Sequence, residues 1–139
     1  MRKISMLAAG LLFTGVVANA QCDGKTTWIA STTEFIRSSG EPQSKPGTVT
    51  VTTDKQYFSV VTADGEEELT GPITEFICNW KDSTNGDISF KSAIRDKQGD
   101  LRHATVSIQA KDGKTIITLE ATEEQTKIRL PIDSYTTVK

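Results

Sequence analysis

The chain has 139 residues, with 16 basic and 18 acidic side chains and a formal net charge of −2 at pH 7. A chain of this length forms one domain with one modest hydrophobic core. The mildly acidic, well-mixed charge excludes the basic surface that a nucleic-acid partner requires, so no such partner is expected.

The N-terminus has the parts of an export signal peptide. Two basic residues precede a run over residues 4–18 that is almost entirely apolar or small, and this run is too short for a membrane span. An A-x-A cleavage site ends at Ala20, and no later apolar run is long enough to cross a membrane. The sequence therefore predicts a signal peptide over residues 1–20, one domain over residues 21–139, and a periplasmic or extracellular location.

Two cysteines, Cys22 and Cys78, remain in the predicted mature chain. Two cysteines in an exported chain most simply form one disulfide, which would leave no free thiol as a nucleophile. A lipid anchor on Cys22 is the alternative, but bacterial lipoproteins carry small residues directly before the anchored cysteine, whereas Gln21 is bulky and polar. We therefore expect a Cys22–Cys78 disulfide and no lipid anchor.

Alternation of apolar and polar residues predicts strands along the whole mature chain. Residues 48–53 read Thr-Val-Thr-Val-Thr-Thr, which places both valines on one face. In chain order the predicted strands cover residues 26–36, 47–53, 56–63, 66–70 continuing into 73–81, 87–95, 102–110, 115–122 and 126–133. Gly71-Pro72 is expected to mark a bend or bulge in the fourth strand, because proline cannot donate a hydrogen bond to a strand ladder.

Short turns separate these strands. Asn85-Gly86 and Asp112-Gly113 tolerate the positive φ of tight hairpins, and short links force consecutive strands to pair as antiparallel neighbours. Ser38–Gly47 is the longest irregular loop expected. The predicted fold class is all-β: a single antiparallel meander of about eight strands, forming an up-and-down barrel or a strongly curved sheet or sandwich.

In size, export signal and strand order the chain resembles small lipocalin-like (calycin-type) β-barrel proteins exported by bacteria. The resemblance covers the mature chain as architecture only. Lipocalins typically carry Gly-x-Trp at the first strand, whereas here three residues separate Gly24 from Trp28. The resemblance implies a barrel whose interior can hold a small apolar ligand, and it carries no ligand residues across.

The sequence offers little catalytic chemistry. The single histidine, His103, falls on a polar strand face without the partners that triads and zinc sites need, and the common hydrolase and metal motifs are missing. The acidic stretches at residues 64–68 and 82–87 depart from calcium-loop spacing and are predicted to be solvated turns. Glu34 and Glu75, each beside a phenylalanine, are expected to face solvent. No catalytic residue, metal or cofactor is predicted, and we expect the protein not to be an enzyme.

Aromatic residues are the remaining candidates for a site. They are predicted to lie on one face of neighbouring strands, where they could line an apolar pocket: Trp28, Phe58, Phe76, Trp80 and Phe90. The first hypothesis is a non-enzymatic exported module that binds a small apolar ligand among them. The alternative is a filled core in a structural or protein-interaction module of the bacterial envelope, such as a partner or inhibitor of another secreted protein, with exposed loops as binding elements.

Overall fold

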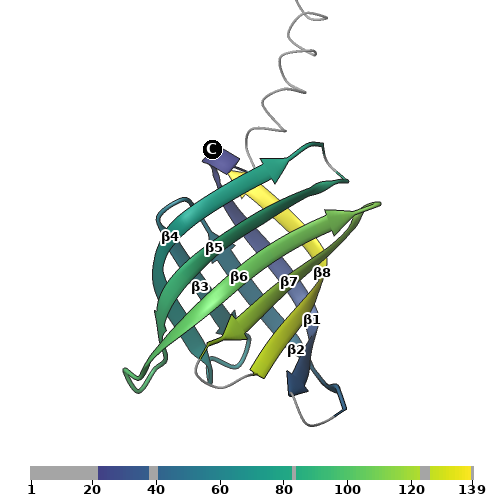
Figure 1. Ribbon diagram of the computed structural model, residues 1–139. Coiled ribbons are helices and arrows are strands. Elements are labelled where there is room, and N and C mark those ends of the chain that lie inside the picture. Colours follow the sequence, from purple (N-terminus) through teal and green to yellow (C-terminus); the bar gives the residue numbers. More distant parts are fainter. Residues whose placement is uncertain (1–21, 38–40, 83, 123–125, 139) are drawn as a thin grey trace, which may run out of the picture.

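Eight antiparallel strands close into one barrel (Figure 1). The computed structural model describes residues 22–37, 41–82, 84–122 and 126–138. In chain order the strands are β1 (Lys25–Arg37), β2 (Gln43–Thr53), β3 (Tyr57–Thr62), β4 (Glu68–Trp80), β5 (Gly86–Arg95), β6 (Leu101–Lys111), β7 (Lys114–Ala121) and β8 (Thr126–Val138). Each strand pairs with the next, and β8 pairs with β1. The predicted all-β meander is therefore confirmed as a closed barrel. Residues 1–20, where the signal peptide is predicted, lie outside the described residues.

The strands are strongly staggered around the barrel. The partner of Trp28 in β2 is Val51, the partner of Val51 in β3 is Val60, and the partner of Val60 in β4 is Leu69. Following these partners from strand to strand leads from the first part of β1 to the beginning of β4. Tilted strands need such a stagger in order to close into a barrel. A consequence is that β3 pairs only with the first part of β4.

Two strands are longer than expected from the sequence. Residues 43–47, predicted to be irregular, belong to β2 and pair with β1, for example Pro46 with Thr32. A proline is tolerated here because β2 and β3 pair only from Val49 onward, so this part of β2 is a strand edge. The other strand, β8, continues past residue 133 to Val138, where it pairs with the first residue of β1.

The predicted irregularity at Gly71-Pro72 is in the wrong place. The β4 ladder passes through Pro72, which lies opposite Tyr57 at the end of the pairing with β3. The register instead shifts between Thr74 and Ile77, and Glu75 between them has a φ of 53°. Because a bulge changes which face successive residues occupy, the half-buried side of β4 switches from odd-numbered to even-numbered positions there.

The predicted dry face of the meander forms the interior of the barrel. Its fully or nearly fully buried apolar residues are Trp28, Ala30, Val49, Val51, Phe58, Trp80, Ile88, Phe90, Ile94, Ala104, Val106, Ile108, Ala110, Ile117, Leu119 and Leu130. These positions alternate with exposed or half-buried ones in β5, β6 and β7. The alternation read from the sequence therefore assigns the core correctly in these strands.

The predicted disulfide is present. Cys22 and Cys78 are bonded, with their Cα atoms 5.7 Å apart and a sequence separation of 56. Both cysteines are half-buried and pack against the core from just outside the start of β1 and from the last part of β4. The bond thus ties the beginning of the described chain to its middle.

We expect Gly71→Ala to lower the free energy of unfolding by about 1–3 kcal/mol, because a β-carbon would overpack the wall between β4 and β5. It would lie 2.5 Å from the backbone oxygen of Ala93 and 2.6 Å from Oγ of Ser92, and the backbone atom cannot swing away. Urea unfolding measures the change. Gly99→Ala is the comparison: its β-carbon meets open space, and only the positive φ of 88° opposes it. A Gly71 variant no less stable than the Gly99 variant would contradict the steric argument.

Candidate functional site

The structure brings all five predicted aromatic residues into the barrel interior. Trp28 and Phe58 are fully buried, Phe90 and Trp80 are 2% and 7% exposed, and Phe76 is half-buried against them. Phe58 and Phe90 meet edge to face with ring centroids 5.2 Å apart, and Phe76 stacks 6.5 Å from Phe90. These rings therefore pack against one another inside the barrel.

A second aromatic group lies at the end of the barrel where β1 begins. The rings of Trp28 and Trp80 are 5.9 Å apart, and Tyr135 of β8 lies 4.9 Å from Trp28 and 6.4 Å from Trp80. Tyr135 lies beyond residue 133, where the last strand was predicted to end, and a one-residue shift in the pairing of β8 with β1 at Asp133 turns it inward. Partial burial raises the pKa of the Tyr135 phenol, so this ring is neutral at physiological pH.

Two side-chain hydrogen bonds lie at this end of the interior. The indole nitrogen of Trp28 donates to Oγ1 of Thr53 at 3.0 Å, and the hydroxyls of Thr26 and Thr137 lie 3.0 Å apart. Two other buried polar atoms, Nε1 of Trp80 and Oγ of Ser92, have no hydrogen-bond partner among the described residues. The buried residues are therefore mostly apolar, with two unsatisfied polar side-chain atoms among the described residues.

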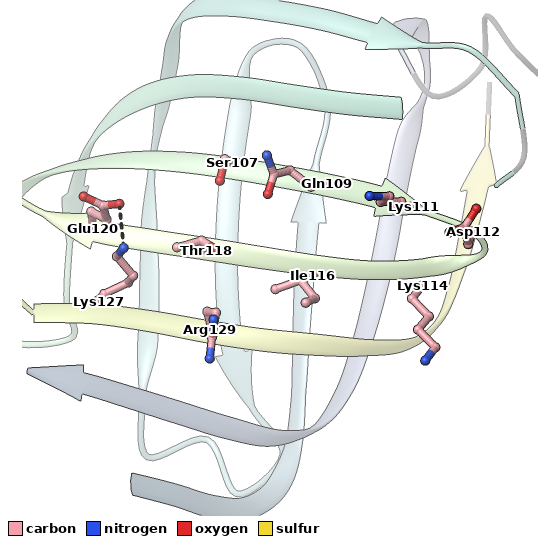
Figure 2. A pocket seen from close by; sticks show the side chains of 10 residues that line it. All are labelled: Ser107, Gln109, Lys111, Asp112, Lys114, Ile116, Thr118, Glu120, Lys127 and Arg129. Atoms are coloured by element: carbon pink, nitrogen blue, oxygen red, sulfur yellow. Dashed lines mark ion pairs between the residues drawn. The ribbon is translucent and has the colours of Figure 1, made fainter. Parts of the chain in front are cut away.

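A hollow on the described surface lies outside the barrel, across β6, β7 and β8 (Figure 2). It has a volume of about 640 Å³ and is open to solvent. We call it the outer hollow; its lining consists of Ser107, Gln109, Lys111, Asp112, Lys114, Ile116, Thr118, Glu120, Lys127 and Arg129. The sequence analysis did not single out any of these residues as a site.

Strand register explains how the outer hollow is built. Ser107, Thr118 and Arg129 are direct partners across β6, β7 and β8, and Gln109 lies opposite Ile116. Short or uncharged side chains thus occupy the middle of the hollow, while the charged side chains stand around them (Figure 2). Outward-facing residues that look scattered in the sequence form adjoining rows on the sheet.

Ion pairs hold two of the cations at the border of the outer hollow. Nζ of Lys127 is 3.4 Å from Oε1 of Glu120, and Nε of Arg129 donates to Oε1 of Glu34 at 3.1 Å. Glu34 is thus half-buried and paired, whereas it was expected to face solvent. A second, smaller hollow adjoins the first and shares Gln109 and Lys111 with it.

Two cations of the outer hollow lie opposite each other. Lys111 and Lys114 are partners across the β6–β7 hairpin, and neither forms an ion pair with a described residue. Like charges directly opposite on a sheet destabilise each other. Asp112 lies between them in the turn, so this end of the outer hollow carries two lysines and one carboxylate.

The other residues considered from the sequence do not converge on one site. His103 is exposed on the outer face of β6, and Glu75 is exposed and 3.5 Å from Nζ of Lys91. Among the described residues, no three His, Cys, Asp or Glu side chains are grouped so that they could hold a metal ion. In the same part of the chain, no helix is long and apolar enough to cross a membrane.

The acidic stretches near Asp64 and Asp82 form hairpin turns, as predicted. Oδ1 of Asp64 accepts hydrogen bonds from the Thr62 hydroxyl and the Glu66 amide, which lower the pKa of this carboxyl. The Thr84 amide and hydroxyl likewise donate to Asp82 and lower its pKa. Each carboxylate therefore acts as a turn cap.

Compared with known proteins, the chain matches no family model and no curated sequence. The closed eight-stranded antiparallel barrel is consistent with a lipocalin-like architecture.

Proposed function

We propose that this protein is an exported, non-enzymatic module of the bacterial envelope that binds another protein through the outer hollow. The anatomy of the hollow is the observation that carries the proposal. Ile116 and the hydroxyls of Ser107 and Thr118 lie in its middle, and long charged side chains stand around them. Protein interfaces have this arrangement, with a centre depleted of charge and a polar rim.

The rigidity of the wall supports the same function. The β6–β7 ladder is unbroken from the Ala104–Ala121 pair to the Lys111–Lys114 pair. The floor of the hollow is therefore preformed before a partner binds. Preorganisation reduces the entropy that binding costs. The disulfide and the signal-like N-terminus support export, and an exported protein would meet its partner in the envelope or outside the cell.

We expect Thr118→Arg to reduce partner capture about tenfold, because it places a large charged side chain in the middle of the interface. The mature protein, immobilised, would be exposed to an envelope extract, and bound proteins would be quantified by mass spectrometry. Thr50→Arg is the matched control, since Thr50 is equally half-buried on the outer side of β2 and away from the outer hollow.

The comparison between these two variants decides the proposal. A protein captured by the wild type and the Thr50 variant but lost with the Thr118 variant supports it. Equal capture by both variants, or no stoichiometric capture by the wild type, would count against it. Far-UV circular dichroism and urea midpoints must match among the three proteins, so that misfolding does not imitate a lost interface.

A small apolar ligand in the interior is the second candidate. It is favoured by the unpartnered Nε1 of Trp80 and Oγ of Ser92, because a ligand with polar atoms could satisfy both. It is opposed by the contacts among Phe58, Phe76 and Phe90, which leave the rings packed on each other. Native mass spectrometry separates the two functions: an extra mass that disappears on denaturation supports the ligand, and its absence supports the outer hollow.

A further inference from the structure

We propose that Cys22, Asp23 and Gly24 form a strap across an unpaired edge of the barrel wall, and that reduction of the Cys22–Cys78 disulfide releases this strap and opens the aromatic end of the interior. The proposal concerns a different part of the molecule from the outer hollow. It holds or fails independently of partner binding.

The unpaired edge belongs to the last part of β4. Pairing with β3 ends where Pro72 meets Tyr57, followed by one hydrogen bond from the Ile73 amide to the backbone oxygen of Gln56. From Thr74 to Trp80, β5 is the only described strand that pairs with β4. A strand edge without a neighbour leaves backbone donors and acceptors unused, and this stretch of the wall is therefore weaker than stretches paired on both sides.

The strap ties the two sides of this edge together. On one side Cys22 is bonded to Cys78 of β4. On the other side Oδ1 of Asp23 lies 2.8 Å from Nζ of Lys55, in the turn between β2 and β3. Gly24, which follows, is buried. Both charged side chains of the ion pair are about half exposed, so the pair contributes little and the disulfide is the principal tie.

The second aromatic group lies next to the strap. Trp80 follows Cys78 by two positions on the same inward face, and its ring contacts Trp28 and Tyr135. Nε1 of Trp80 is buried, and no described residue lies within hydrogen-bonding distance of it. Opening the strap would let water reach this donor, which offsets part of the cost of exposing the rings.

Release of the strap would break no strand pairing. The ladder between β1 and β8 begins at Lys25 and Val138, directly after the strap. The strap is therefore a separate local unit, and its opening can occur while all eight ladders stay intact.

The chemistry of release is thiol–disulfide exchange with a dithiol reductant. One thiolate of the reductant attacks a sulfur of the Cys22–Cys78 bond, which forms a mixed disulfide and releases the other cysteine as a thiolate. The second thiolate of the reductant then attacks the reductant's sulfur in the mixed disulfide and releases the remaining cysteine thiolate. The protein gains two electrons and two protons and ends with two thiols, while the reductant becomes a disulfide. Both cysteines are only half-buried.

The test compares the oxidised and reduced mature protein in native buffer with dithiothreitol as the dithiol. Because both tryptophans of the chain belong to the aromatic group beside the strap, acrylamide quenching of their fluorescence reports on its opening. We expect the quenching constant to rise about twofold on complete reduction while the far-UV circular dichroism stays unchanged. A Cys22→Ser/Cys78→Ser variant should show the raised value without any reductant.

Two results would overturn the proposal. Unchanged quenching after mass spectrometry shows complete reduction would mean that the strap does not cover the rings. A collapse of the circular dichroism on reduction would mean that the disulfide holds the whole barrel and not a separate strap. Amide hydrogen exchange gives an independent reading, since faster exchange should be confined to Thr74–Trp80 and the first residues of β1.

The ion pair offers a matched control. Asp23→Asn removes the second tie of the strap, whereas Glu120→Gln removes a surface ion pair on β7 of similar exposure. We expect reduction by dithiothreitol to be about twofold faster for the Asp23 variant and unchanged for the Glu120 variant. Equal rates for both variants would exclude Asp23 from the strap.

Discussion

Trp28→Ala is expected to lower the free energy of unfolding by about 3–5 kcal/mol, because it removes a large side chain from a closed interior and leaves a cavity. Trp28 is fully buried, its ring lies 4.9 Å from Tyr135, and its indole nitrogen donates to Thr53. Urea unfolding of the oxidised protein measures the loss.

Trp28→Phe separates the ring from the hydrogen bond. Phenylalanine keeps most of the apolar contact but leaves Oγ1 of Thr53, which is 6% exposed, without its donor. The expected loss is about 1–2 kcal/mol, in the range of one buried hydrogen bond. If the alanine variant were no less stable than the phenylalanine variant, packing around Trp28 would not stabilise the barrel in the way argued here.

Removal of the disulfide is the second large effect. The Cys22→Ser/Cys78→Ser variant should be less stable by about 4 kcal/mol, the chain-entropy value for a loop of this length, because the unfolded chain gains the freedom that the bond removes. The sequence separation of 56 sets this expectation. The difference between the urea-unfolding free energies of the oxidised wild type and the variant gives the number.

Reduced wild-type protein provides the control for that comparison. It should match the serine variant, because both lack the same covalent link. A loss below about 1 kcal/mol would show that the unfolded chain is already constrained between Cys22 and Cys78, or that the bond strains the native state. Domains of this size have about 5–15 kcal/mol of stability, so the variant is expected to remain folded in water.

The strands and most of the core could be predicted because alternation and turn chemistry act locally. The alternation from Ala104 to Ala110 predicts the buried face of this strand without information about the neighbouring strands, and Asp112-Gly113 predicts the next turn. Closure of the barrel was one of the alternatives left open, since it depends on the total stagger of all the strands.

Two of the errors arise at register shifts. Glu75 adopts a positive φ for which a glutamate gives no sequence signal, and the resulting bulge could not be placed in advance. A shift at Asp133 carries Tyr135 to the inward face, which simple alternation would not have predicted. The outer hollow was missed for a related reason: Ser107, Thr118 and Arg129 become neighbours only once three strands are in register.

The pairing of Lys25 with Val138 places the two ends of the folded domain side by side at one end of the barrel. A short linker could therefore join them, and the chain could be reopened in the exposed turn at Gly99 between β5 and β6. Such a circular permutant would keep all eight strand pairings while moving both termini to the opposite end of the barrel. The strand pairings of the closed sheet therefore do not depend on which turn carries the chain termini.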